Sequence, residues 1–373
     1  MPSATMTPVR PVATTLGRTT ADLVWQAALA AGERESAGEA AGLTKVIVNG
    51  APVPSTLGAF VRGLSAGGPA PALADLCALS AEKVETLLVY ARAIEGHDRA
   101  LYEAVLSDLG EHLLETGLPR GRAECEMFLG WYPATPGGIH REDCDNLHLV
   151  LQGHKEFLFF AGGDWIPRDE PRRPDSDPVT GLAEDYLPSL RPEVVESAAR
   201  VCSLGPGEGL RWPRRLWHVG RSPQLSLSLN VASYRDAPEA YPVLRGTDGQ
   251  VTPAWLRGYH RFLGRTGTPG DDLPTLLAQA SSAGLRPAPA PLRRLPSRPR
   301  HARRRLHTPV LWCQLRPGLV SVAVTGAHLA LPSAVIPMLA WLSHPSSAEW
   351  PMREKDRVLV HWLAQQGVVE VSA

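Results

Sequence analysis

The sequence has little of what marks secreted and membrane proteins. Its 373 residues include 5 cysteines, scattered and without a Cys-x-x-Cys pair, which favours reduced thiols in a cytoplasmic protein. No apolar run approaches the roughly 20 residues that a membrane span requires, and the first residues lack the apolar core of a signal peptide. We therefore expect a cytoplasmic protein with no membrane partner.

The chain also has no formal net charge. The 38 Lys and Arg residues balance 38 Asp and Glu residues, so the charge of the whole chain identifies no partner. Locally, no acidic residue occurs between Asp272 and Glu349, and this part contains a Pro- and Arg-rich range, 286–305, that is typical of a linker. We expect no nucleic-acid partner, because the predicted helix at Pro332–Ser343 carries no Arg or Lys.

The stretch Gly137–Phe160 carries the clearest signal of a functional site. It contains His140 and Glu142 two residues apart, and alternate residues of a strand point to the same face, so both side chains can reach one metal ion. The best candidate for a third ligand is His218, which follows a Gly-rich turn and Pro213. Two imidazoles and one carboxylate form the facial triad that binds non-haem Fe(II) and leaves positions open. The alternative interpretation is a set of unrelated histidines on strands.

Together these motifs resemble the jumonji-type branch of the cupin Fe(II)/2-oxoglutarate-dependent oxygenases, in particular the hypoxia-inducible-factor asparaginyl hydroxylase and ribosomal oxygenase branch. That branch carries His-x-Asp/Glu, a Gly-x-Lys, and a distal His followed by a Ser-Leu-Ser-x-Asn run. The corresponding segments here are His140–Glu142, Gly153–Lys155, Trp217–Val219 and Ser226–Asn230. The resemblance covers about Glu124 to Tyr234 and is weaker outside that range.

The resemblance implies a role for each matched residue. Fe(II) would be bound by His140, Glu142 and His218, and Lys155 would pair with the distal carboxylate of the co-substrate 2-oxoglutarate. The co-substrate pocket would also be lined by Asn146, Asn230 and Ser228. The role of Lys155 is physically sensible as well, because a buried ammonium group needs an anionic partner. Arg141, Arg214 and Arg215 are the alternative cations for that carboxylate.

One position departs from the family pattern. Hydroxylases of this branch usually have Asp where Glu142 stands, although Glu is normal in the jumonji demethylases. Asp143 and Asp145 are therefore competing carboxylates. We rank Glu142 first, because Asp143 would point to the opposite face of an unbroken strand.

The many short strands separated by Gly and Pro turns, together with the resemblance, predict a mainly β fold with flanking helices. It would be a double-stranded β-helix, the cupin/jumonji jelly roll, followed by a helical segment and a C-terminal winged-helix-like α+β module. The expected order is a flexible tail at 1–18, an oxygenase domain at 19–236, a helical dimerisation segment at 237–285, the linker at 286–305 and a winged-helix-like domain at 306–373.

Local patterns add expectations within the oxygenase domain. Apolar residues at helical spacing predict helices at Ala81–Gly96 and Ala100–Thr116, packed outside the sheet. The polar range Asp164–Asp185 contains several prolines and is typical of an inserted loop. We weigh two interpretations of it equally, a lid or substrate rim and a solvated insertion.

The implied reaction uses Fe(II), 2-oxoglutarate and dioxygen to hydroxylate an amino-acid side chain within a peptide or protein, such as a ribosomally synthesised natural product precursor or a ribosomal protein. Two alternatives stay open: a hydroxylase of a free or carrier-tethered amino acid, and a non-catalytic cupin-like metal-binding protein. Demethylation of methyl-lysine is less favoured, because no aromatic cage is visible. The expected partners are a peptide or protein substrate and, by analogy with ribosomal oxygenases, a second copy of the chain in a homodimer.

Overall fold

The structure is a computed structural model that describes residues 9–13, 16–39, 42–53, 57, 84–176, 183–234, 241, 249–266, 272–290, 296, 300–306, 308–343 and 349–372. Two compact units make up the chain. The first comprises Met1–Leu16, Thr20–Asp98 and Glu124–Asp236, and the second comprises Gly17–Thr19, Arg99–Ala123 and Ala237–Ala373. Within the described ranges, no helix has the length and apolarity needed to cross a membrane.

The first unit is built on antiparallel strands. They are β1 (Arg10–Ala13), β2 (Thr44–Val48), β3 (Ala51–Pro52), β4 (Leu87–Ala91), β5 (Ala123–Tyr132), β6 (Ile139–Glu142), β7 (Cys144–Gln152), β8 (Lys155–Phe160), β9 (Arg173–Ser176), β10 (Ala183–Leu187), β11 (Ala199–Leu204), β12 (Glu208–Trp212) and β13 (Trp217–Tyr234). One path runs β1-β12-β7-β13-β5-β4-β2-β3, and a second path, β9-β10-β6-β13-β8-β11, shares β13 with it.

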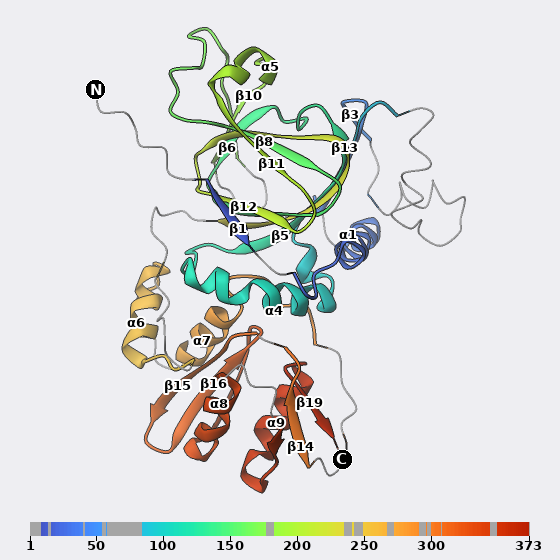
Figure 1. The fold of residues 1–373 in the computed structure, drawn as a ribbon. Helices are drawn as coiled ribbons and strands as arrows, with labels where there is room; N and C mark the ends of the chain where they lie inside the picture. The colour runs from blue at the N-terminus through green and yellow to red at the C-terminus, as the bar shows by residue number, and fades with distance from the viewer. Residues whose placement is uncertain are drawn as a thin grey trace. The chain divides into compact units, whose positions relative to one another are not determined.

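Strand β13 joins the two paths, because its 18 residues are long enough to take part in both. Its first residues, Trp217–Arg221, pair with β8, and His218 also pairs with β6. Its last residues, 227–234, pair with β7, with a register shift between Leu227 and Ser228. In Figure 1, β6, β8 and β11 form one layer and β1, β12 and β5 another. This mainly β arrangement agrees with the predicted jelly-roll fold.

The apolar run in β8 shows why the strands hold together. Alternate side chains of a strand point to opposite faces. Phe157 and Phe159 pack with Val150 and Trp212 in one buried cluster, whereas residues 158 and 160 pack in another cluster with Ile139. Because both faces of β8 are covered, its sequence is a continuous apolar run and not an alternating one.

Helices lie beside these strands in the first unit. Among the described residues of this unit the longest is α1 (Ala21–Ser36), where the Thr20 hydroxyl accepts a hydrogen bond from the backbone N–H of Leu23 at 3.2 Å and so caps the helix. Short helical turns follow at η1 (Ile94–Gly96), α5 (Pro192–Val195) and η2 (Glu196–Ala198).

The helix predicted at Ala81–Gly96 is wrong over most of its described length. Residues 87–91 form β4, which pairs with β2 on one side and β5 on the other, and residues 81–83 lie outside the described ranges. Strand β4 is buried on both faces, so its apolar residues do not alternate. A short, continuously apolar run cannot be distinguished from a buried helix by its period. The helix predicted at Ala100–Thr116 is present as α4 (Arg99–Glu115).

The second unit contains α4 and two small sheets. Strands β15 (Val310–Arg316), β16 (Leu319–Val324) and β17 (Ala327–Pro332) form one sheet, and β14 (His301–Arg304), β18 (Trp350–Pro351) and β19 (Val369–Ser372) form the other. The helices of this part are α6 (Pro253–Phe262), α7 (Leu273–Ser281), α8 (Ile336–Ser343) and α9 (Arg357–Gln365), with 3-10 turns η4 (Ser333–Val335) and η5 (Glu354–Asp356). Residues of β15, β16, α8 and α9 share one buried apolar cluster.

Two features of this unit bear on the predicted division of the chain. Strand β14 lies at the end of the range expected as a linker, and it pairs with both β18 and β19. Helix α7, expected in the dimerisation segment, packs against β15, β16 and β17. The domain boundaries and the winged-helix-like architecture of 306–373 remain predictions.

Candidate metal centre

His140, Glu142 and His218 come together in the first unit. One ligand atom from each side chain lies within 4.8 Å of the other two, which is the separation expected of donors around a single ion. The pairing of β6 with β13 sets His140 opposite His218, and their ring centroids are 4.4 Å apart. Glu142 follows on the same face of β6, with its Oε1 3.7 Å from His218 Nε2. Cross-strand pairing and the two-residue period of β6 thus produce the cluster together.

Backbone carbonyls fix the tautomer of both histidines. His140 Nδ1 lies 3.0 Å from the Gly138 carbonyl oxygen, and His218 Nδ1 lies 2.9 Å from that of Leu216. A carbonyl only accepts, so each Nδ1 carries the proton and donates it, which leaves Nε2 with a free lone pair. Burial, followed by the neighbouring His140, lowers the pKa of His218 well below its ordinary value. His218 is therefore neutral near pH 7, as a metal ligand must be.

Glu142 is held in place by an amide. Asn146 Nδ2 donates to Glu142 Oε1 at 3.0 Å. The competing carboxylates have other contacts: Asp143 lies 3.6 Å from Arg215 Nε, and Asp145 accepts from the Arg214 backbone N–H at 2.9 Å. Neither belongs to the group of three ligand atoms found among the described residues.

A cavity of about 390 Å³ opens beside the cluster, and all three candidate ligands line it. Its wall also includes Lys155 and Asn230, two residues that the sequence motifs matched to co-substrate binding. Asn146 lines it as well, next to Glu142. The cavity therefore connects the candidate metal ligands with a buried cation.

Lys155 enters the cavity from the first position of β8 because of the turn before it. Gly153 has φ +76°, and a Cβ at this position would collide with the carbonyl oxygen of Leu225, so only glycine fits. Lys155 is 2% exposed, and its Nζ donates to Tyr132 Oη at 2.9 Å and Ser228 Oγ at 3.3 Å. It also lies 4.6 Å from the Phe128 ring centroid. Within the part of the chain that the structure describes, no carboxylate forms an ion pair with it.

Three polar atoms around the cavity have no hydrogen-bond partner within the described residues. They are His148 Nε2, Trp212 Nε1 and Asn230 Oδ1, and each side chain is at most 3% exposed. Burying a polar group without a partner is costly, so these atoms indicate that a polar molecule occupies the space. Burial, followed by the positive charge of Lys155, lowers the pKa of His148 well below its ordinary value. His148 is therefore neutral.

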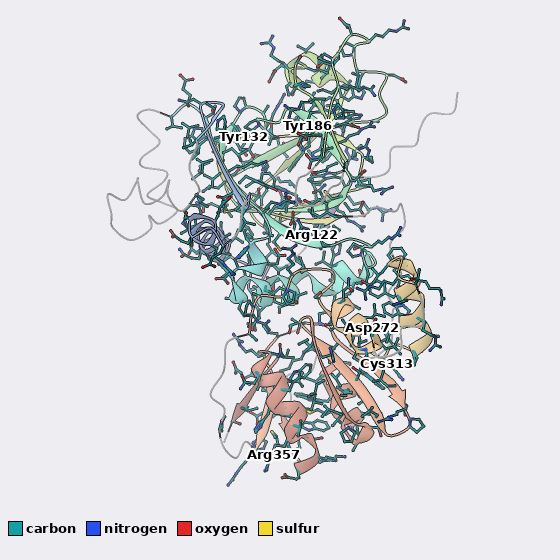
Figure 2. All side chains as sticks on the ribbon, turned by 180° about the vertical axis from the view of Figure 1, so that it is seen from behind. Arg122, Tyr132, Tyr186, Asp272, Cys313 and Arg357 are labelled. Atoms are coloured by element: carbon teal, nitrogen blue, oxygen red, sulfur yellow. The ribbon has the colours of Figure 1, made fainter. Side chains whose placement is uncertain are left out.

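The sequence motifs do not point to Tyr132, His148 or Trp212. Each stands on a strand rich in apolar residues, where aromatic side chains usually belong to a core. The available signal was alternation: Asn146 and His148 are two residues apart on β7 and share a face. Tyr132 and Tyr186 come from different strands of the first unit and are labelled in Figure 2, but only Tyr186 lines the cavity.

The range expected to be an inserted loop, Asp164–Asp185, contains β9 and the beginning of β10. These two strands pair with each other, and β10 also pairs with β6, the strand of His140 and Glu142. Cavity-lining residues from this hairpin are Arg173, Asp175, Glu184 and Tyr186, and the Tyr186 ring stacks on His140 with centroids 5.5 Å apart. The range was expected to be either a lid or substrate rim or a solvated insertion, and these contacts agree with the rim. Residues 177–182 lie outside the described ranges.

Two of the alternative cations for the co-substrate are engaged elsewhere. Arg141 Nε and Arg215 Nη2 both donate to Asp185 Oδ2, at 2.7 and 2.6 Å. Arg141 also lies over the Trp217 ring, 4.6 Å from its centroid. Neither arginine, nor Arg214, lines the cavity, so Lys155 is the better-placed cation.

Fold and site together describe a mainly β protein whose antiparallel strands carry a His/Glu/His group beside a polar cavity.

No family model matches the chain, and no curated protein matches it. Among solved structures, YcfD from Escherichia coli is 14% identical, covering 97% of this chain and 95% of that chain, with a TM-score of 0.45. The ribosomal oxygenase YcfD from Escherichia coli in complex with cobalt and 2-oxoglutarate is 13% identical, covering 98% and 95%, with a TM-score of 0.44. Its complex with cobalt and succinic acid has the same values. These structures are ribosomal oxygenases, the group that the sequence motifs resemble, but at this identity and TM-score the likeness assigns neither a site nor an activity to this chain.

Proposed function

We propose that this chain is an Fe(II)/2-oxoglutarate-dependent dioxygenase that hydroxylates an amino-acid side chain within a peptide or protein. The observation that carries the proposal is a single cavity with two features. Two imidazoles and a carboxylate lie on its wall within 4.8 Å of one another, and Lys155 brings a buried ammonium group that has no anionic partner among the described residues. A metal-chelating dianion satisfies both features at once.

The donor set fits Fe(II). His140 and His218 present Nε2, since their Nδ1 protons are committed to backbone carbonyls, and Glu142 provides the third ligand. Three protein ligands on one face leave room for two co-substrates, as non-haem Fe(II) oxygenases require. When bound, Fe(II) with 2-oxoglutarate and dioxygen supplies the oxidising power that converts a C–H bond to C–OH, with release of succinate and carbon dioxide.

The cavity also fits 2-oxoglutarate. Lys155 would pair with the distal carboxylate, and Tyr132 and Ser228 would hold the ammonium group in position, since both accept hydrogen bonds from its Nζ. The unpartnered donor of Trp212, with His148 and Asn230, supplies polar contacts near the other end of such a molecule. The rings of Phe128 and Phe157 would shield the aliphatic chain from water.

The substrate is proposed to enter between the β9–β10 hairpin and β2. Glu184 and Arg173 on the hairpin and Lys45 on β2 are polar residues of the cavity wall that can contact a peptide backbone or its side chains. Tyr186, stacked on His140, would limit how far a side chain reaches over the metal. The wider assignments, namely a natural product precursor or ribosomal protein as substrate, a homodimer and a cytoplasmic location, remain proposals that rest on the resemblance.

All proposed ligand and co-substrate residues lie in the first unit. We therefore propose that 306–373 supplies no catalytic group and acts in holding the substrate or a second copy of the chain. The winged-helix-like description of this range is part of the same proposal.

The deciding experiment measures succinate formation from 2-oxoglutarate by the Fe(II)-reconstituted chain, alone and with peptide pools or free amino acids. The proposal expects slow succinate release alone and a product 16 mass units heavier in a peptide, the mass of one added oxygen. Hydroxylation of a free or carrier-tethered amino acid would replace the peptide assignment. Metal binding without any succinate would support a non-catalytic metal-binding protein instead.

A further inference from the structure

Two carboxylates are buried close together in the first unit. Glu124 and Glu126 on β5 are 0% and 7% exposed, and Arg92, just after β4, is the buried cation beside them. Arg92 Nε donates to Glu124 Oε1 at 3.1 Å, so the positive charge is committed to Glu124. The contacts of Glu126 are instead neutral: Tyr90 Oη donates to its Oε1 at 2.6 Å, and Asn230 Nδ2 donates to its Oε2 at 2.8 Å.

These contacts continue to the candidate metal ligand. Asn230 Nδ2 also donates to Asn146 Oδ1 at 2.6 Å, and Asn146 Nδ2 donates to Glu142 Oε1 at 3.0 Å. An unbroken hydrogen-bonded path therefore leads from Glu126 through two amides to Glu142. The strand pairing supports it, because Asn146 is opposite residue 232 and Asn230 is opposite His148 in the ladder of β7 and β13.

The hydrogen bonds along this path all have a defined donor and acceptor, and Glu126 determines which way the two amides are oriented. A side-chain amide offers an acceptor at one end and donors at the other. Because Glu126 Oε2 accepts, Asn230 must turn its NH2 group inward, and Asn146 then receives that group on its oxygen. Asn146 is left with its NH2 group facing Glu142. If both amides were reversed, the Asn146 oxygen would face the Glu142 carboxylate, and two acceptors would repel each other.

We propose that Glu126 is a positioning residue for the metal site, which acts through Asn230 and Asn146 to hold the Glu142 carboxylate toward His140 and His218. This inference rests on the metal site of the proposed function. It concerns a carboxylate that lies outside the ligand group and that no motif pointed to.

The direction does not depend on the charge of Glu126. Burial, followed by the charges of Glu124 and Glu142, raises the pKa of Glu126 to about 8. When protonated on Oε1, the acid donates to the Tyr90 hydroxyl, which can accept as well as donate, and Oε2 still accepts from Asn230. A glutamine reproduces this protonated form, with its oxygen toward Asn230 and its NH2 group toward Tyr90.

The test compares Glu126→Met with Glu126→Gln in the full-length chain. Methionine keeps the length of the side chain and removes the acceptor, whereas glutamine keeps the acceptor. Glu156→Met is the matched control, because Glu156 lies on the face of β8 opposite to Lys155 and contacts Ser203 at 3.3 Å. Each protein is titrated with Co(II) alone, without 2-oxoglutarate, and binding and coordination are followed by visible absorption.

We expect Glu126→Met to weaken Co(II) binding by about 10- to 100-fold, the usual effect of losing a group that orients a ligand, and to change the absorption spectrum. Glu126→Gln and Glu156→Met should bind with affinity close to that of the unmodified chain. A merely structural role for Glu126 would lower the stability of Glu126→Met but leave its Co(II) absorption spectrum unchanged. If Glu126→Met does not fold, Asn230→Leu interrupts the same path and should weaken Co(II) binding equally.

Two outcomes would overturn the inference. Unchanged Co(II) affinity and spectrum in folded Glu126→Met or Asn230→Leu would show that the path does not position Glu142. Equal loss in Glu126→Met and Glu126→Gln would show that the negative charge matters and not the direction of the hydrogen bonds. Failure of the unmodified chain to bind Co(II) is a different result, since it would refute the metal site and with it the proposed function.

Discussion

Replacing Lys155 by methionine separates the proposed co-substrate cation from every other feature of the cavity. Methionine is unbranched and of similar length, so it fills the space beside Phe128 and Phe157 without leaving a large cavity. The change removes the ammonium group and its hydrogen bonds to Tyr132 and Ser228. It does not touch the three candidate metal ligands, so metal binding should be retained.

The expected loss of 2-oxoglutarate affinity follows from the strength of a charge-assisted hydrogen bond. A bond to a charged group contributes about 1.5–3 kcal/mol, which corresponds to a roughly 10- to 150-fold higher dissociation constant. The upper part of this range applies, because Lys155 is 2% exposed and little solvent can replace it. The control is Lys45→Met. Lys45 lines the same cavity but is exposed, so solvent and salt screen its charge and the constant should hardly change.

The assay is calorimetric titration of 2-oxoglutarate into Co(II)-loaded protein without oxygen, so that binding is measured without turnover. Metal affinity is determined separately for each variant. If Lys155→Met binds 2-oxoglutarate as tightly as the unmodified chain, Lys155 is not the partner of the distal carboxylate. Arg141 and Arg215 would then have to leave Asp185 to take its place.

Four further predictions test the remaining parts of the site. His140→Ala and His218→Ala should each abolish Co(II) binding in spectroscopic titrations, and tight binding by either would refute the ligand group. Tyr132→Phe should weaken 2-oxoglutarate binding less than the lysine change, because the charge stays, and an effect as large would mean that Tyr132 is itself the main contact. In the metal-free protein, the pKa of Glu126 is raised to about 8, so the folded state binds the Glu126 proton more tightly than the unfolded state does. This proton therefore stabilises the folded state fully below about pH 4.5, and the stabilisation is lost as the pH rises toward 8. Glu126→Gln should therefore flatten this part of the stability curve in urea unfolding, and an unchanged slope would show that Glu126 does not titrate there. Deletion of 306–373 should leave Co(II) binding intact, since the ligands lie in the first unit, and loss of binding in a truncated chain that is still folded would contradict this division.

Patterns within single strands allowed part of the site to be predicted. His140 and Glu142 share a face because of the two-residue period of a strand, and both residues line the cavity in the structure. The positive φ of Gly153, in the turn before Lys155, is also a local feature that favours glycine. In each case a few adjacent residues determine the geometry, whereas the crowding of Gly153 against Leu225 is a tertiary contact.

Other elements could not be predicted from local patterns. Strand β4 was assigned to a helix, since burial on both faces removes the alternation that identifies a strand. The apolar stretch around Glu126 conceals its role, although Glu124 and Glu126 alternate with apolar residues on β5 and so share a face with Phe128. The roles of Glu124 and Glu126 depend on hydrogen bonds from Arg92 and Asn230. These residues come close to β5 only because β5 pairs with β4 and β13.

The sequence by itself determined the donor types, the face shared by His140 and Glu142, and the mainly β character of the first unit. Only the tertiary structure decided that His218 lies opposite His140, that Lys155 has no carboxylate partner among the described residues, and that two amides link Glu126 to Glu142. The physical reason is that alternation along a strand is a local property of the backbone, whereas strand pairing joins residues far apart in the chain. The register of β13 against β6 and β7 therefore makes one site out of separate motifs.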